Sequence, residues 1–251
     1  VLRERGGDRP FVATKAGRRL PAQTVEGYSA ANLEDWVERS LRNLQVDTLD
    51  LLQLHCPPTD AYYRPEIFER LDRLVERGKI ARYGVSVERV EEALKAIEFP
   101  GVASVQIIYN MFRLRPAELF FRQAQQRGVA VIVRVPLASG LLSGKFSADT
   151  RFEADDHRQF NRHGEAFDVG ETFAGVPYGV GLAAVEKLRP LVPEGVTLAQ
   201  LALRWILMDE AVSVVIPGAR NPAQALANIG AAGLPALSPQ TMAAVARIYE
   251  Q

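Results

Sequence analysis

Short runs of apolar, β-branched residues recur along the chain and alternate with longer amphipathic segments. The runs are rich in Val, Ile and Leu, and most are bounded by Gly, Pro or polar residues, as expected of strands that are buried on both faces. We therefore predict strands at residues 11–14, 49–54, 82–86, 103–108, 129–135 and 212–216.

The segments between these strands have the spacing of amphipathic helices. Residues 29–44 carry an apolar stripe behind Ser29, a residue type that caps helix N-termini. Residues 65–77 repeat the pattern and stop at Gly78, which readily takes the left-handed conformation that ends helices. The same reasoning predicts helices near 88–97, 116–127, 180–191, 197–208, 222–232 and 239–249.

Strands that alternate with single helices indicate right-handed βαβ units and a parallel sheet. The sequence lacks a Gly-x-Gly-x-x-Gly fingerprint, which favours a barrel over a Rossmann sheet. We predict an α/β fold of the TIM-type (β/α)8 barrel class, as a single domain over residues 1–251. Only six of the eight β/α units of a closed barrel are present in this sequence.

One long segment, at about 146–181, breaks this rhythm. It is polar and rich in Asp, Arg, His and Gly, with phenylalanines at weak periodicity. A structureless stretch of this length inside a compact domain is usually functional, and it follows a strand on the rim where barrel active sites form. We interpret it as a loop that covers the substrate; the alternative is a tolerated surface insertion.

Composition adds mild limits. Thirty basic and thirty acidic residues give no net charge, so nothing favours nucleic acid or an anionic membrane as a partner. The single cysteine, Cys56, excludes an internal disulfide and a cysteine-based metal site, and no metal is expected. The absence of an apolar run long enough to span a bilayer makes a cytoplasmic location the default expectation. We expect a small-molecule partner and a monomer or weak homo-oligomer.

Two proton-handling side chains follow predicted strands. Lys15 closes one apolar strand and His55 closes the next, so both belong to the same rim of a parallel barrel. Each residue alone is more often a solvated lysine or a structural histidine. Together they could stabilise a developing oxyanion and steer a carbonyl, whereas a Schiff-base lyase using Lys15 would need a desolvated amine. Cys56 is interpreted as inert packing.

Six strings, in order along nearly the whole chain, carry a resemblance to a known family. They are residues 11–15 (FVATK), 47–55 (DTLDLLQLH), 84–86 (GVS), Gln106 with 109–110 (YN), 136–145 (PLASGLLSGK) and 216–220 (IPGAR). In this order and at these strand ends they resemble the aldo-keto reductase family.

The resemblance implies an NADPH-dependent carbonyl reductase on a (β/α)8 barrel. Lys15 would lower the pKa of a catalytic tyrosine, and His55 would orient the substrate carbonyl. Ser86 and Gln106 would hold the nicotinamide carboxamide, although Val87 replaces the asparagine of many relatives. The remaining cofactor contacts implied are a pyrophosphate clasp at Leu137, Ser139, Gly140, Leu142 and Lys145, and an adenosine end at Gly218, Ala219, Arg220, Gln224 and Asn228, with Arg220 on the 2′-phosphate.

Arg134 stands where many relatives carry an aromatic residue that stacks on the nicotinamide. A planar guanidinium can also stack on a ring, so we expect Arg134 to contact the cofactor. The alternative is an ion pair with a neighbouring acid.

The family's fold begins with two further β/α units, and the second supplies an aspartate and a proton-donating tyrosine; this sequence supplies neither. None of Tyr28, Tyr62, Tyr63, Tyr109 and Tyr178 occupies the position of that tyrosine. We expect the chain to be part of a longer enzyme. The alternative is a catalytically inactive module of this fold that binds NADPH or a partner.

Overall fold

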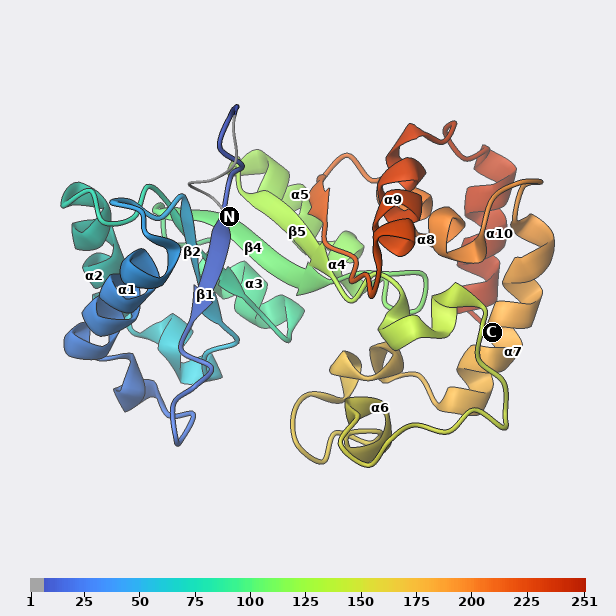
Figure 1. Cartoon of the computed structure of the whole chain (residues 1–251), viewed down its shortest axis with the longest axis horizontal. Coiled ribbons are helices and arrows are strands. Elements are labelled where there is room, and N and C mark those ends of the chain that lie inside the picture. Colours follow the sequence, from blue (N-terminus) through green and yellow to red (C-terminus); the bar gives the residue numbers. More distant parts are fainter. Residues whose placement is uncertain (1–6) are drawn as a thin grey trace. The chain divides into compact units, whose positions relative to one another are not determined.

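The computed structural model describes residues 7–251, which fall into two compact units (Figure 1). Unit 1 contains the described residues up to Gln106 together with Gln123–Ala130. Unit 2 contains Ile107–Arg122 and Val131–Gln251. The strand β4 (Val102–Ile108) passes from the first unit into the second.

Unit 1 is built on parallel strands paired in chain order. β1 (Ala13–Ala16) pairs with β2 (Leu51–His55), β2 with β3 (Tyr83–Ser86), and β3 with β4. Every residue of β3 is buried, as is almost all of β2 and β4, which explains why these strands read as nearly continuous apolar runs. The strands predicted at these positions are confirmed, with ends shifted by up to two residues.

The helices of unit 1 begin and end where the sequence indicates. α1 (Ala30–Leu44) starts behind Ser29, whose side chain accepts a hydrogen bond from the Asn32 N–H at 3.3 Å. α2 (Pro65–Glu76) is followed by Gly78 at φ +70°, the left-handed geometry that ends a helix. α1 and α2 pack against each other (Figure 1), and α3 (Val90–Ala96) and α5 (Phe120–Gln126) follow β3 and precede β5.

Unit 2 contains one parallel strand pair, β5 (Ala130–Arg134) with β6 (Val212–Val215). The predicted helix at 116–127 is divided at Leu119, whose φ of −137° is not helical, into α4 (Arg115–Glu118) and α5. Tyr109 stacks on Trp205 with ring centroids 5.1 Å apart and meets Phe121 edge-on. These rings form part of the apolar core of unit 2.

The C-terminal helices are also capped as the sequence predicts. α8 (Leu198–Ile206) begins with a reciprocal capping box between Thr197 and Gln200. α10 (Pro239–Tyr249) begins behind Ser238 with proline in its first turn. α7 (Tyr178–Leu188) packs against α10, and α9 (Pro222–Gly230) packs against α8.

The segment at 146–181 is not structureless, which corrects the sequence-based expectation. It contains α6 (His157–Phe160) and two single 3₁₀ turns, η4 (Val169–Glu171) and η5 (Phe173–Gly175). Fully buried Asn161 accepts hydrogen bonds from the Ala166 and Phe167 N–H groups at 2.8 and 2.9 Å and donates to Thr172 Oγ1 at 3.2 Å. We call residues 146–177 the lid segment. Its order depends on a side-chain amide, a signal that hydrophobic periodicity does not contain.

Six strands lie within residues 7–251, and each pairing described above is parallel, as the predicted α/β fold requires. Over the same residues, none of the helices combines the length and apolar character needed to cross a bilayer.

Candidate active site

Unit 1 carries the two residues predicted to handle protons. Lys15 pairs with Gln53 in the parallel register, and His55 lies two residues further along β2. Because side chains alternate along a strand, these three side chains share one face of the sheet. The structure therefore brings Lys15 and His55 to neighbouring strand ends on the same face, as predicted.

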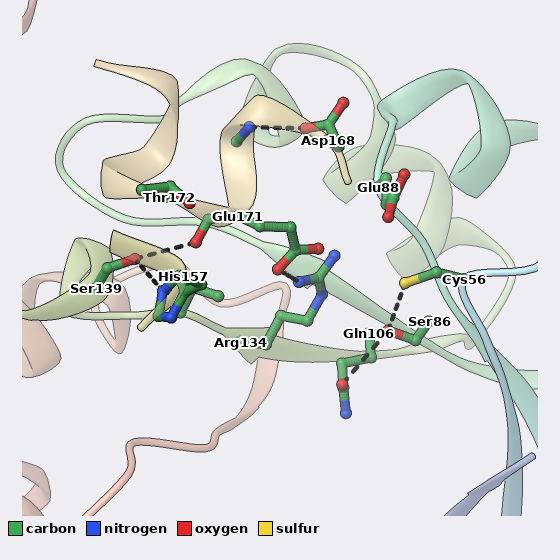
Figure 2. A network of polar contacts seen from close by, with 12 residues as sticks. Cys56, Ser86, Glu88, Gln106, Arg134, Ser139, His157, Asp168, Glu171 and Thr172 are labelled. Carbon is green, nitrogen blue, oxygen red and sulfur yellow. Dashed lines mark hydrogen bonds and ion pairs between the residues drawn. The ribbon is translucent and has the colours of Figure 1, made fainter. Parts of the chain in front are cut away.

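A chain of buried polar side chains runs across the same unit. Ser86 Oγ donates to Gln106 Oε1 at 3.5 Å, and Gln106 Nε2 donates to Gln53 Oε1 at 3.1 Å. Gln53 Nε2 in turn donates to Ser104 Oγ at 3.4 Å. Cys56 Sγ lies 3.6 Å from Ser86 Oγ (Figure 2). Ser86 and Gln53 are fully buried and Gln106 is 4% exposed. The predicted carboxamide-binding pair thus lies in one hydrogen-bonded network, which we call the amide chain.

Five tyrosines differ in burial and in their contacts. Tyr28, Tyr62 and Tyr109 are buried, and burial raises the pKa of each phenol above its ordinary range. Tyr63 is exposed, and the Tyr178 hydroxyl donates to the Ser147 carbonyl. A phenol with a raised pKa is a weaker acid, so Tyr28, Tyr62 and Tyr109 are poorly suited to protonate a substrate oxygen.

Unit 2 carries the predicted pyrophosphate clasp in a compact turn, η3 (Ala138–Ser143). Ala138, Ser139 and Gly140 all have positive φ, and a Cβ added to Gly140 would lie 2.8 Å from the Phe146 ring. The N–H groups of Ala138, Gly140 and Leu142 donate within the turn, to the carbonyls of Val135 and Leu137, and fix its shape. The backbone requirement explains why small residues occupy this segment.

The clasp residues differ in how they are exposed. Leu137, Ser139 and Gly140 line a cavity of about 850 Å³, and Gly140 and Lys145 line a second one of about 630 Å³. The side chain of Leu142 is fully buried in the core and lines neither cavity. The Leu142 N–H donates to the Leu137 carbonyl.

Residues of the predicted adenosine end line the same two cavities. Gly218 and Arg220 line both, and Ala219 and Gln224 line the smaller one. Gln224 Oε1 accepts from the Arg220 N–H at 2.7 Å, and Asn228 Nδ2 donates to the Gly218 carbonyl at 3.2 Å. Gln224 and Asn228 thus hold the loop that presents Arg220 and Gly218.

Arg134 forms the ion pair that the alternative interpretation expected. Its Nη1 lies 2.5 Å from Glu171 Oε2, and the two side chains are only 11% and 17% exposed (Figure 2). Ser139 Oγ donates to the Glu171 carbonyl at 3.0 Å and accepts from the Phe173 N–H at 3.2 Å. Two residues predicted to contact the cofactor therefore also hold the lid segment.

The lid segment adds polar side chains to the larger cavity. Asp155, Asp156, His157 and Arg158 all line it. Arg158 donates through Nε to Asp156 Oδ1 at 2.8 Å, and this hydrogen bond is the main reason why the pKa of Asp156 is lowered to about 2. His157 Nε2 lies 3.4 Å from Ser139 Oγ, so the segment contacts the clasp directly (Figure 2).

Each unit offers its own set of polar groups. Unit 2 offers a positive-φ loop, cavities within the size range of small-molecule sites, and Lys145 and Arg220 as cations for phosphate. Unit 1 offers buried amide and hydroxyl groups suited to a carboxamide.

Some residues at these sites were missed from the sequence. Gln53 is a lone amide within the apolar strand β2, and this mismatch was an available signal for a buried polar contact. Glu171, His157, Arg158 and Asn161 lie in the lid segment, where no periodicity marked them. Their roles depend on tertiary contacts of a segment with little regular structure.

The sequence profile described as "Aldo/keto reductase family" matches residues 2–250. Among individual relatives, the aldo-keto reductase YhdN of Bacillus subtilis is 30% identical over 80% of this chain and 59% of its own length. A probable voltage-gated potassium channel subunit beta of Arabidopsis thaliana is 27% identical over the whole chain and 77% of its own length.

Two solved structures of aldo-keto reductases are also similar to this chain. The glycerol dehydrogenase AKR11B4 from Gluconobacter oxydans superposes with a TM-score of 0.77 at 27% identity, over 98% of this chain and 74% of that structure. The holo form of the aldo-keto reductase AKR11C1 from Bacillus halodurans gives a TM-score of 0.73 at 26% identity, over 96% and 72%. The chain thus spans between about three fifths and three quarters of the length of these relatives.

Proposed function

Because the chain belongs to the aldo/keto reductase family, we propose that it serves the NADPH-dependent reduction of an aldehyde or ketone to an alcohol. The observation that carries the proposal is the meeting of the clasp at 137–140 with Gly218 and Arg220 around one cavity of about 850 Å³. A loop of positive-φ residues facing an arginine is suited to a nucleotide that carries several phosphates.

Residues of this chain would bind the cofactor and orient the substrate. When bound, the nicotinamide supplies the hydride. Ser86 and Gln106 hold its carboxamide through hydrogen bonds and so fix which face of the ring meets the substrate. His55 donates a hydrogen bond to the substrate carbonyl, and Lys15 stabilises the negative charge that develops as the proton is delivered. The family resemblance assigns the proton donation to a tyrosine.

Arg220 is the proposed contact for the 2′-phosphate, which distinguishes NADPH from NADH. Fluorescence titration should show that Arg220→Ala weakens NADPH binding by about tenfold or more, as expected for the loss of a charged hydrogen bond. NADH binding should change little, because that cofactor lacks the phosphate. Arg247→Ala, on the exposed face of α10, provides a matched control. An equal loss of affinity for NADPH and NADH in Arg220→Ala would contradict this assignment.

A second candidate function is cofactor binding without turnover. It is favoured by the relatives from Arabidopsis thaliana and Oryza sativa, which are named as probable potassium channel beta subunits. NADPH titration paired with an aldehyde-reduction assay on the complete protein separates the two. Binding with cofactor oxidation supports the reductase, binding without oxidation supports the module, and absence of binding contradicts both.

A further inference from the structure

Gln53 is a fully buried amide within an otherwise apolar strand. A buried side-chain amide is costly unless its carbonyl and its amine both find partners. Gln53 finds both: its Oε1 accepts from Gln106 Nε2, and its Nε2 donates to Ser104 Oγ. Both ends of the Gln53 amide are therefore hydrogen-bonded within the amide chain.

Gly84 explains how Gln53 reaches these partners. In the register, Gln53 of β2 pairs with Gly84 of β3, and Gly84 pairs with Ser104 of β4. A Cβ on Gly84 would lie 2.2 Å from Ser104 Oγ, so only glycine leaves this space open. The side chain of Gln53 passes over Gly84 and contacts Ser104 and Gln106 on β4. Two strand spacings, about 10 Å, separate β2 from β4.

The two ends of the Gln106 amide have different partners. Its Nε2 donates to Gln53 and its Oε1 accepts from Ser86. An amide held only by Ser86 could rotate by half a turn and exchange its oxygen and nitrogen, because a hydroxyl group both donates and accepts. The Gln53 carbonyl can only accept, so the two amide orientations are coupled: while Gln53 Nε2 donates to Ser104, Gln106 must turn its Nε2 towards Gln53.

We infer that Gln53 is a positioning residue that fixes the orientation of the Gln106 amide and thereby makes the nicotinamide subsite selective for a carboxamide. The inference rests on the proposed function. With its orientation fixed, Gln106 keeps a second lone pair on Oε1, which accepts the N–H of a ring carboxamide. A cofactor whose carboxamide is replaced by an acetyl group has no hydrogen to offer at that position.

The test compares NADPH with its 3-acetylpyridine analogue by titration of the protein, without turnover. The original protein should bind NADPH about tenfold more tightly than the analogue, the value of one well-formed hydrogen bond at a buried site. In Gln53→Leu this preference should fall to about twofold or less, because Gln106 no longer has a fixed orientation. Gln125→Leu, at an exposed position of α5, should retain the full preference.

Gln53→Glu separates positioning from packing. Lys15 pairs with this position in the register, and in either protonation state the carboxyl group presents an oxygen that accepts from Gln106 Nε2. Gln53→Glu should therefore restore the preference for NADPH that Gln53→Leu loses. If Gln53→Leu weakens both cofactors equally, or if Gln53→Glu behaves like Gln53→Leu, Gln53 only fills space and the inference is overturned.

A measurement on the free protein keeps this test independent of the proposed function. The side-chain NH₂ protons of Gln106, followed by ¹⁵N NMR, should exchange slowly with solvent in the original protein and in Gln53→Glu, and rapidly in Gln53→Leu. Slow exchange in all variants would overturn the inference. If the original protein binds neither NADPH nor the analogue, the proposed function fails, whereas the exchange rates still decide whether Gln53 holds Gln106.

Discussion

The two units hold their site residues by different means. In unit 1, Ser86, Gln106 and Gln53 lie on strands, are buried, and bond to each other through side chains. In unit 2, the clasp is a turn with positive-φ residues, and at the adenosine end two side chains of α9 hold the loop at 218–220. The lid segment is attached to β5 by the Arg134–Glu171 ion pair and to the clasp by Ser139.

This difference determines which perturbations each group can resist. The strand-borne group depends on register and close packing, so an added methyl group should disturb it more than a change of charge. The loop-borne group depends on charged and partly exposed contacts, which respond to pH and salt. Each prediction below alters one group by the route expected to affect it most.

Gly84→Ala should have the largest effect. Its Cβ would lie 2.2 Å from Ser104 Oγ and 2.3 Å from the Ser104 carbonyl oxygen, so β3 and β4 must separate. We expect the free energy of unfolding to fall by about 3 kcal/mol, at the upper end for overpacking. Urea denaturation measures the loss. Gly179→Ala, where a Cβ meets nothing within 4 Å, should not be destabilised; a similar loss there would show that close packing is not the cause.

Glu171→Leu should have the next largest effect, because it leaves the largely buried Arg134 guanidinium without its carboxylate. We expect a loss of about 2–3 kcal/mol, less than for a completely buried pair because both groups retain some exposure. Arg134→Met combined with Glu171→Leu should recover part of this loss, since no unpaired charge remains. If the double variant is less stable than Glu171→Leu alone, the pair is not the cause.

Asn161→Ala should loosen the lid segment while leaving the strands intact. It removes the acceptor of two backbone N–H groups and the partner of Thr172 Oγ1. We expect a local loss of about 2 kcal/mol, and a faster cleavage of residues 146–177 by protease. The exposed Gln159→Ala, in α6, is the control. Unchanged cleavage of Asn161→Ala would refute the central place of Asn161 in the segment.

Acidification should weaken the start of α6 by a smaller amount. The Arg158 hydrogen bond lowers the pKa of Asp156 from 3.8 to about 2, so the folded state favours the carboxylate. The stabilisation is complete above the ordinary pKa and is lost as pH falls towards 2. Asp156→Asn keeps a helix-capping side chain but removes the titration. Protease sensitivity of the lid segment should therefore rise on acidification in the original protein and change less in Asp156→Asn; identical profiles would contradict this.

Most of the fold could be predicted from the sequence because its signals are local. Strand positions follow from apolar runs, and helix boundaries follow from Ser29, Gly78 and Thr197, whose capping or left-handed geometry the structure contains. The division of the predicted 116–127 helix at Leu119 was missed, because nothing in the local sequence marks a break there.

Residues of the candidate site were predictable only where they lie at strand ends or within family motifs. Ser86 and Gln106 were found in this way, and the structure joins them by a hydrogen bond. The partners that hold these residues were not found, because Gln53 acts across an intervening strand and Glu171 lies 37 residues from Arg134. Leu142 satisfies the motif, yet its side chain belongs to the core.

Hydrogen–deuterium exchange with and without NADPH tests the account most directly. Backbone N–H groups should form the phosphate contacts in unit 2, so peptides over 137–145 and 218–228 should gain strong protection when the cofactor is added. Peptides over 83–87 and 102–108 should change little, because these strands are already buried and would contact the cofactor through side chains. Protection confined to the strands, or no protection of residues 137–145, would contradict the proposed cofactor site.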